Sequence, residues 1–147
     1  MSAPGSNRID GRSLDLDTVG AVAHARTLDL GLDSAARSRM ERSRAVVDAA
    51  LTRNDRVYGI STGFGRLSEV YIGEARRQEL QLNLVRSHAS GVGRPLGRAE
   101  VRAMMVLRAN ALARGNSGCR PALVERLLDF INRGLTPVVP EAGSVGA

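Results

Sequence analysis

A short glycine-rich segment carries the side chain best suited to proton transfer in this sequence. Tyr58 is followed by Gly59, and Gly63 and Gly65 complete the run Tyr-Gly-Ile-Ser-Thr-Gly-Phe-Gly. Three glycines in eight positions disfavour regular structure, so a functional loop is expected. Such a loop can close over a substrate as a lid, with Tyr58 near backbone amides that stabilise its phenolate, and Tyr58 could then act as a general base. The alternative is a hairpin or anion-binding turn with Tyr58 packed at its edge.

A histidine near the middle of the sequence is the second candidate for chemistry. His88 follows Leu80 and Leu84 at steps of four residues, which places all three on one face of a predicted helix. Ser87 precedes His88, and the small residues 89–93 leave room for a ligand or for a close helix crossing. The alternative is a core histidine whose ring nitrogens are bonded within the protein.

The remaining polar residues indicate structural roles rather than catalysis or metal binding. Cys119 is the only cysteine, so no internal disulfide can form, and the chain has too few cysteines and histidines for a zinc site. We expect Cys119 to be structural, in a protein of a reducing, cytoplasmic compartment. Arg108 and Asn110 fall in an apolar helical segment, where bonds to neighbouring helices are the favoured role.

Hydrophobic periodicity predicts a mainly α fold that would hold these residues in place. The loop that begins at Tyr58 separates two segments of helical periodicity. A short strand at 14–16 is expected to lead to a helix capped by Asp17 or Thr18, and Ser34 can cap the next helix. The predicted helices run through residues 19–23, 34–51, 73–89, 98–114 and from 121 to a stop at Gly134.

The two ends of the chain differ from the helical middle. Residues 1–12 are polar and are expected to form a disordered tail, which makes 13–147 the folded part. Pro137 and Pro140 bracket extended chain, and no sheet is predicted. Small residues at 143–147 close the sequence without a capped helix, so the chain is expected to be a fragment.

The net charge of +6 raises the question of an anionic partner. All 21 basic residues are arginines, and they are scattered between Arg8 and Arg133 without a block of like charges or interleaved aromatic rings. Residues 1–10 lack the pattern of a signal peptide, and no stretch reaches the ~18 apolar residues of a membrane span. We expect neither a nucleic-acid nor a membrane partner. On charge alone, an Arg-rich helical nucleic-acid-binding module is the remote alternative.

Several motifs follow one another along residues 57–147. They are 57–65 (VYGISTGFG), 80–88 (LQLNLVRSH), 108–110 (RAN), 117–121 (SGCRP) and 137–147 (PVVPEAGSVGA). In sequence and in order they resemble the motifs of the aromatic amino acid ammonia-lyases, the family of histidine, phenylalanine and tyrosine ammonia-lyases and related aminomutases. One such motif would be suggestive, and several in register make a chance similarity implausible.

The resemblance implies a fold and a prosthetic group. Members of this family are mainly helical proteins of the fumarase/aspartase-like superfamily, and they are homotetramers whose active sites are shared between subunits. The chain would then be the N-terminal part of the catalytic domain, with the helical body missing. By the same resemblance, Ala147 and the two residues expected after it would form 4-methylidene-imidazole-5-one (MIO), with no metal required.

The resemblance also implies roles in eliminating ammonia from an aromatic amino acid, a small-molecule substrate. The β-hydrogen is hardly acidic and the amine is a poor leaving group, so the reaction needs both a base and an electrophile. The implied roles are Tyr58 as the base, Gly65 and Ala147 as further catalytic positions, Gly59 and Gly63 as hinges of the lid loop, and Ser87 and His88 as substrate contacts.

The Ser87-His88 pair bears on which amino acid is the substrate. Phenylalanine lyases of the family usually present Phe-Leu there and tyrosine lyases His-Leu, whereas histidine lyases carry Ser-His. A polar imidazole substrate would use the hydrogen-bonding capacity of His88. Against this, Ser61 stands where histidine lyases usually have Asn, and some bacterial tyrosine aminomutases resemble the Ser-His form. L-Histidine, converted to urocanate, is the leading expectation. A tyrosine ammonia-lyase or tyrosine 2,3-aminomutase is the alternative.

Overall fold

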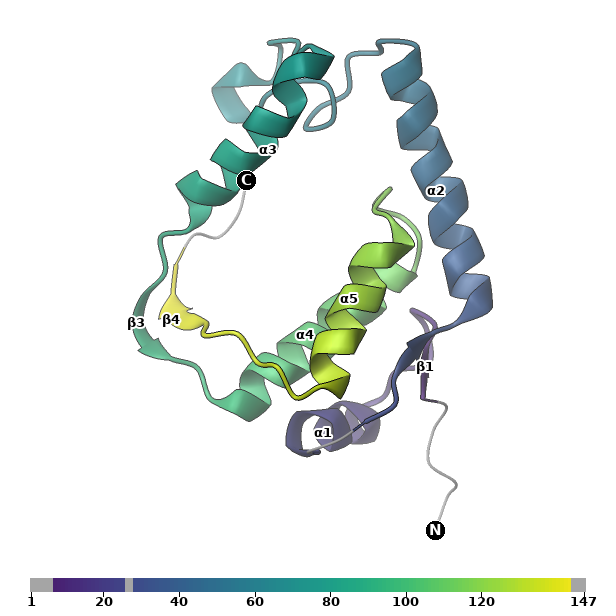
Figure 1. Ribbon diagram of the computed structural model, residues 1–147, viewed down its shortest axis with the longest axis vertical. Coiled ribbons are helices and arrows are strands. Elements are labelled where there is room, and N and C mark those ends of the chain that lie inside the picture. The colour runs from purple at the N-terminus through teal and green to yellow at the C-terminus, as the bar shows by residue number, and fades with distance from the viewer. Residues whose placement is uncertain (1–6, 26–27, 144–147) are drawn as a thin grey trace. The chain divides into compact units, whose positions relative to one another are not determined.

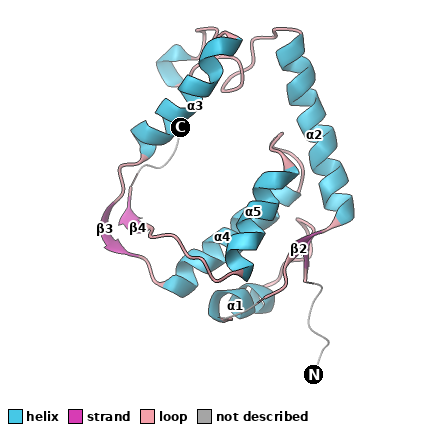
Figure 2. Ribbon diagram, viewed as in Figure 1, coloured by secondary structure: helices cyan, strands magenta, loops and turns pink. Residues whose placement is uncertain are grey.

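The computed structural model describes residues 7–25 and 28–143. The chain divides into two compact units, which we call unit 1 (Met1–Ala45 and Leu96–Val138) and unit 2 (Val46–Pro95 and Val139–Ala147). The described residues form five α-helices and only short strands (Figures 1 and 2). The predicted mainly α class is therefore confirmed.

Unit 1 is built around helix α4, Arg98–Ala113, which packs against α1, Leu16–His24, and α5, Pro121–Asn132 (Figure 1). The fixed φ and missing N–H of Pro121 suit a first helical turn, and Gly115 ends the preceding helix at a φ of 80°. Apolar side chains at helical spacing fill the space between the three helices. The buried ones are Val22, Val101, Met105, Val106, Ala109, Val124, Leu128 and Ile131. Each large one contributes about 1.5–3 kcal/mol, so this core holds unit 1 together.

A buried arginine joins the three helices of unit 1. The guanidinium of Arg102 donates from Nε to the carbonyl of Val22 and from Nη1 to that of Ile131, each at 3.0 Å. These carbonyls belong to the last turns of α1 and α5, so the cation faces the negative ends of two helix dipoles. Nη2 has no partner among the described residues. Burial lowers the pKa of Arg102, and the nearby charge of Arg98 lowers it further.

The prediction that residues 1–12 form a disordered tail is wrong for the second half of this segment. Strand β1, Arg8–Ile9, pairs in parallel with β2, Gly31–Leu32, and the Ile9 side chain is only 3% exposed. A strand of two residues is too short for sequence periodicity to reveal. Residues 1–6 lie outside the described residues, so the prediction stands untested there.

The turn that follows β1 is fastened to α4. Gly11 has a φ of 80°, and its N–H donates to Asn110 Oδ1 at 2.9 Å. A Cβ on Gly11 would lie 2.6 Å from the backbone nitrogen of Arg114, so only glycine fits there. Asn110 therefore bonds within the fold, as expected, but to the turn after β1 rather than to the predicted neighbouring helix.

The first helix begins earlier than predicted. Asp15 is the N-cap of α1, and its carboxylate accepts the N–H of Thr18 at 2.8 Å. The predicted strand at 14–16 and the predicted cap at Asp17 or Thr18 are both wrong, because Asp15 already satisfies a free helical N–H.

The second helix, α2, Ser34–Thr52, runs from unit 1 into unit 2. Asp33 accepts the N–H of Ala36 at 2.9 Å, so the cap is Asp33 rather than the predicted Ser34. Ala36 and Met40 are buried, one helical turn apart, which fixes the inner face of the helix in unit 1.

Unit 2 contains α3, Glu74–His88, and an antiparallel pair of strands, β3, Val92–Pro95, and β4, Pro140–Ala142 (Figure 2). The predicted helix at 73–89 is confirmed to within one residue at each end. The strand pair was not predicted, because the prolines and glycines within it obscure any alternation of apolar residues. Among the described residues α3 has none that is buried, unlike α1, α4 and α5.

Two features are absent from the part of the chain that the structure describes. No helix in the described ranges is both long and apolar enough to cross a membrane. Within 7–25 and 28–143, no three His, Cys, Asp or Glu side chains are grouped so that they could hold a metal ion. Cys119 is a half-buried free thiol, and the hydroxyl of Ser117 lies 3.4 Å from its sulfur.

Candidate active site

Tyr58 lies on the loop between α2 and α3, as predicted, and it presents its phenol to the surface. The side chain is 57% exposed. The N–H of Gly65 donates to the phenol oxygen at 3.4 Å, a long hydrogen bond. The Phe64 ring packs edge-on against the Tyr58 ring, with centroids 5.8 Å apart and planes at 81°. The phenol is thus oriented by a ring and an amide while its hydroxyl stays accessible.

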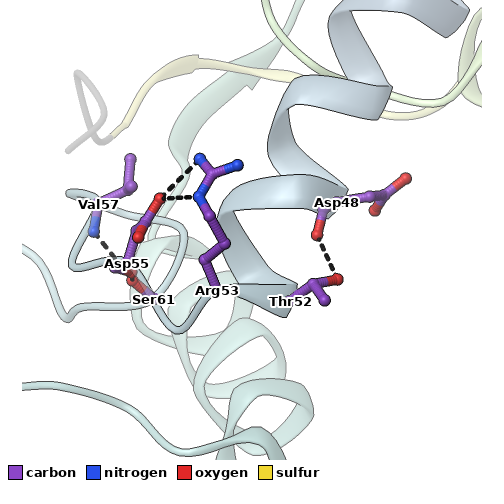
Figure 3. A network of polar contacts seen from close by, with 6 residues as sticks. All are labelled: Asp48, Thr52, Arg53, Asp55, Val57 and Ser61. Atoms are coloured by element: carbon purple, nitrogen blue, oxygen red, sulfur yellow. Dashed lines mark hydrogen bonds and ion pairs between the residues drawn. The ribbon is translucent and has the colours of Figure 1, made fainter.

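The chain enters the loop through a set of polar contacts at the end of α2 (Figure 3). Arg53 binds one carboxylate oxygen of Asp55 through Nε at 3.0 Å and Nη2 at 2.7 Å. The Ser61 hydroxyl donates to the Asp55 carbonyl and accepts the N–H of Val57 at 2.9 Å. The exposed ion pair adds little stability by itself, whereas the buried hydroxyl fixes the backbone before Tyr58.

The other limb of the loop is held by the chain that leads into α3. The N–H of Ile72 donates to the Ser61 carbonyl at 2.8 Å, and the N–H of Gly63 to the Val70 carbonyl at 3.2 Å. Thr62 and Tyr71 form an isolated antiparallel bridge between these two segments. The loop is therefore closed on itself rather than an open connection.

Tyr71 ties this closed loop to the chain just after α2 and to α3. Its hydroxyl donates to Asn54 Oδ1 at 2.8 Å, just beyond the end of α2. Arg77, in the first turns of α3, donates to the same hydroxyl at 3.3 Å and to the Ile72 carbonyl at 3.3 Å. Asn54 has a φ of 58°, a left-handed conformation that ends the helix and turns the chain.

The three glycines of the loop differ in their conformations. Gly59 and Gly65 have φ values of 69° and 54°, which L side chains rarely adopt. Gly63 is buried, and a Cβ there would lie 2.7 Å from the Leu67 Cβ, so close packing explains the glycine. The hinge roles that the resemblance implies for Gly59 and Gly63 stay predictions.

Ser87 and His88 end α3, and their side chains bond within that helix. His88 Nδ1 lies 2.9 Å from the Leu84 carbonyl and 3.1 Å from the Ser87 hydroxyl, which donates to the same carbonyl at 2.9 Å. With Nδ1 engaged, Nε2 is the nitrogen that could meet a ligand. His88 is half-buried, like Leu80 and Leu84, so the predicted stripe is the inner side of α3 but not a closed core.

Ala147, the first residue of the implied prosthetic group, lies outside the described residues. The chain leading to it is described as far as Gly143, one residue beyond β4. A Cβ on Gly143 would lie 3.4 Å from the Gly91 Cα, and a Cβ on Gly91 would lie 2.7 Å from a ring carbon of Pro140. Small residues thus let the two backbones approach closely.

Sequence reasoning located the loop and the end of α3, and it missed the residues that fix the loop. These are the buried hydroxyls of Ser61 and Thr62 and the contacts among Asn54, Tyr71 and Arg77. Adjacent Ser and Thr inside a glycine-rich loop commonly bond to nearby backbone, so that signal could have been read. The Tyr71 contacts span up to 17 residues and carry no local signal.

Comparison with known proteins gives the family. Residues 14–147 match the aromatic amino acid lyase family. The chain is 54% identical over 139 residues to a histidine ammonia-lyase of Anaeromyxobacter dehalogenans, with 95% of this chain and 27% of that protein covered. It is 46% identical over its whole length to a histidine ammonia-lyase of Stigmatella aurantiaca, of which it covers 28%.

Solved structures of related enzymes match the fold. A histidine ammonia-lyase from Trypanosoma cruzi matches with a TM-score of 0.85 and 38% identity, covering 95% of this chain and 26% of that one. A tyrosine aminomutase from Streptomyces globisporus matches with a TM-score of 0.86 and 36% identity, covering 93% and 26%. The chain thus spans about a quarter of the length of the relatives it matches. It belongs to the aromatic amino acid lyase family.

Proposed function

We propose that this chain is part of a carbon–nitrogen lyase that eliminates ammonia from L-histidine to give urocanate. The observation that carries the proposal is the identity of 54% to a protein named histidine ammonia-lyase, over 95% of this chain. The Ser87-His88 pair at the end of α3 supports the same substrate.

In this proposal Tyr58 is the base. Its phenolate oxygen takes the β-hydrogen as a proton, and the electron pair of the broken C–H bond forms the new carbon–carbon double bond. The bond between the α-carbon and the protonated amine breaks as that double bond forms, and its electron pair leaves with the nitrogen as neutral ammonia. An exposed phenol on a loop, with the N–H of Gly65 at its oxygen, supports this role because it is accessible and has a donor for negative charge.

The amine needs an electrophile, and MIO formed from Ala147 and the two residues expected after it would supply that chemistry. The close approach of Gly91 and Gly143 supports this assignment, since it fixes the position of the chain four residues before Ala147. The hydroxyls and amides of the described loop would orient Tyr58 and help to exclude water. In its assembled form the enzyme is proposed to be a cytoplasmic homotetramer with shared active sites, as the family resemblance implies. No residue of α3 is buried among the described ones, so this helix has a face that later helices or another subunit could cover.

Substrate choice in this proposal rests on His88. With Nδ1 bonded to Leu84, its Nε2 could hydrogen-bond to the imidazole ring of L-histidine. The phenyl ring of L-phenylalanine would offer Nε2 no hydrogen-bond partner. A tyrosine ammonia-lyase or tyrosine 2,3-aminomutase is the second candidate, favoured by the match to the Streptomyces globisporus tyrosine aminomutase.

Rates of ammonia release from L-histidine, L-tyrosine and L-phenylalanine by the purified full-length enzyme test the proposal. Urocanate formation from L-histidine, with the largest kcat/KM of the three, is the expected result. A larger kcat/KM for L-tyrosine would overturn the substrate assignment. Release of 3-amino-3-(4-hydroxyphenyl)propanoate from L-tyrosine would identify an aminomutase.

A further inference from the structure

The adjacent buried hydroxyls of Ser61 and Thr62 bond to the backbone on both sides of Tyr58, the proposed base. Ser61 is 0% exposed and Thr62 is 2% exposed, although both carry polar side chains and lie in a loop. Burying a hydroxyl is unfavourable unless it is hydrogen-bonded, so the contacts of these two groups indicate what they do.

The Ser61 hydroxyl bridges the backbone on the N-terminal side of Tyr58. It accepts the N–H of Val57 at 2.9 Å and donates to the carbonyl of Asp55 (Figure 3). Its main-chain groups are engaged as well, because its N–H donates to the Val57 carbonyl at 3.0 Å and its carbonyl accepts the N–H of Ile72 at 2.8 Å. The hydroxyl is therefore used inside the loop rather than presented to a ligand.

The Thr62 hydroxyl holds the backbone on the other side of Tyr58. It accepts the N–H of Gly59 at 3.3 Å and donates to the carbonyl of Gly63 at 3.0 Å. The residues immediately before and after Tyr58 thus each donate to one of two neighbouring hydroxyls. The Gly59 N–H belongs to the peptide unit that follows Tyr58, and the unit before Tyr58 is held at its Val57 carbonyl, which accepts the Ser61 N–H at 3.0 Å. Together with the hydroxyl bond to the Val57 N–H, these contacts restrict the direction in which the Cα–Cβ bond of Tyr58 points.

We infer that Ser61 and Thr62 form a hydroxyl clamp that positions Tyr58 for proton transfer, and that Ser61 is not a contact to the substrate side chain. This inference rests on the proposed role of Tyr58 as the base. Proton transfer depends on placement to within fractions of an ångström, so a backbone held at two points keeps the phenol productive. The serine at position 61 consequently carries no information against L-histidine as substrate.

Variants of the full-length enzyme separate the two halves of the clamp. Ser61→Ala should speed amide hydrogen exchange at Val57 and leave Gly59 unchanged, while Thr62→Val should do the reverse. The loss of one hydrogen bond predicts exchange about twofold to tenfold faster. Both variants should lower kcat by about tenfold to a hundredfold, with a smaller change in KM. Thr62→Ser keeps the hydroxyl and should restore kcat.

A matched control is Thr52→Ala. The Thr52 hydroxyl bonds only one turn back, to the Asp48 carbonyl at 3.0 Å, so its removal should leave both amides and kcat unchanged (Figure 3). The prosthetic group forms with loss of water, so the intact mass of each variant shows whether the group has formed. A variant that forms the group has kept the fold that its formation requires.

The hydrogen-exchange results test the clamp, and the turnover of Tyr58→Phe tests the proposed function. Unchanged exchange at Val57 in Ser61→Ala and at Gly59 in Thr62→Val would overturn the clamp. Faster exchange with unchanged kcat would overturn its positioning role. A change in the ratio of histidine to phenylalanine turnover in Ser61→Ala would make Ser61 a specificity residue and contradict the inference. Normal turnover by Tyr58→Phe would end the proposed role of Tyr58, whereas the exchange data would still decide whether the clamp exists.

Discussion

The backbone N–H of Gly65 faces the phenol oxygen of Tyr58 across 3.4 Å, and the two residues lie seven positions apart on one loop. Gly65 has a φ of 54°, a left-handed conformation that L side chains rarely adopt. The backbone conformation at position 65 therefore explains why this residue of the loop is a glycine. The N–H of Gly65 is thus a backbone donor beside the atom that takes the proton in the proposed mechanism.

Replacing Tyr58 by Phe removes the group that takes the proton and leaves the ring volume nearly unchanged. The ring contact with Phe64 should persist, so the fold and the prosthetic group should be retained. We expect kcat to fall by about 10²–10⁴, the usual contribution of a positioned acid or base. Single-turnover rates of the purified variant measure this, and near-normal turnover would show that Tyr58 is not the base.

Replacing Arg102 by Met should destabilise unit 1. The buried carbonyls of Val22 and Ile131 lose their guanidinium donors, and an unsatisfied buried acceptor costs about 1–3 kcal/mol. Removing the buried charge of Arg102 also removes its desolvation cost, which by itself would raise stability. This gain is small because the C-terminal ends of two helices already stabilise the charge. Urea titration of the full-length protein should show a lower midpoint. Arg42→Met, at an exposed position of α2, is the control and should stay within about 0.5 kcal/mol of wild type.

A carboxylate beside β1 should make stability depend on pH. The N–H groups of Ser13 and Arg12 donate to Asp10 at 2.9 and 2.8 Å and hold the pKa of its carboxyl below the ordinary value of 3.8. Since the folded state holds this proton less tightly than the unfolded state, the stabilisation is complete above the ordinary pKa. It is lost as the pH falls through the lower, folded value.

Asp10→Asn removes this titration, so the difference in thermal midpoint between wild type and variant should shrink as the pH falls from about 6 to about 3. Asp29→Asn removes another exposed carboxyl and serves as the control for the change in net charge. A constant difference between wild type and Asp10→Asn across this range would contradict the role given to Asp10.

Helical periodicity predicted most of the fold because long amphipathic segments carry a repeated signal. The helices α3, α4 and α5 lie where the spacing of apolar residues and the stops at Gly115 and Gly134 placed them. The strands were missed because they are two to four residues long and depend on partners far away in the sequence. The helix caps were misplaced because two or three candidate residues stand next to one another and only geometry chooses among them.

The candidate site was predictable only in part, for a related reason. Glycine spacing marked the loop of Tyr58, and the motif resemblance marked the end of α3. The buried Ser61 and Thr62 use contacts two to six residues away, a range in which several loop conformations compete. No described contact joins Tyr58 to His88, so their cooperation on one substrate stays a prediction.

The clearest test of substrate choice is His88→Phe with Ser87 unchanged. The variant keeps a ring at the end of α3 but loses Nε2, so the polar ring atoms of a histidine substrate would be stranded against an apolar wall. Stranding one buried polar group costs about 1–3 kcal/mol, which corresponds to roughly a tenfold or larger fall in the ratio of histidine to phenylalanine turnover.

The alternative is a structural role for His88, whose Nδ1 lies 2.9 Å from the Leu84 carbonyl. If that bond is its whole role, His88→Phe should lower stability or expression and leave the substrate ratio unchanged. Val85→Phe adds a ring on an exposed position of the same helix and serves as the matched control for altered packing. Ammonia release from L-histidine, L-tyrosine and L-phenylalanine, measured beside the thermal midpoint of each protein, separates the two roles. An unchanged ratio with a lowered midpoint would show that His88 holds the end of α3 rather than the substrate.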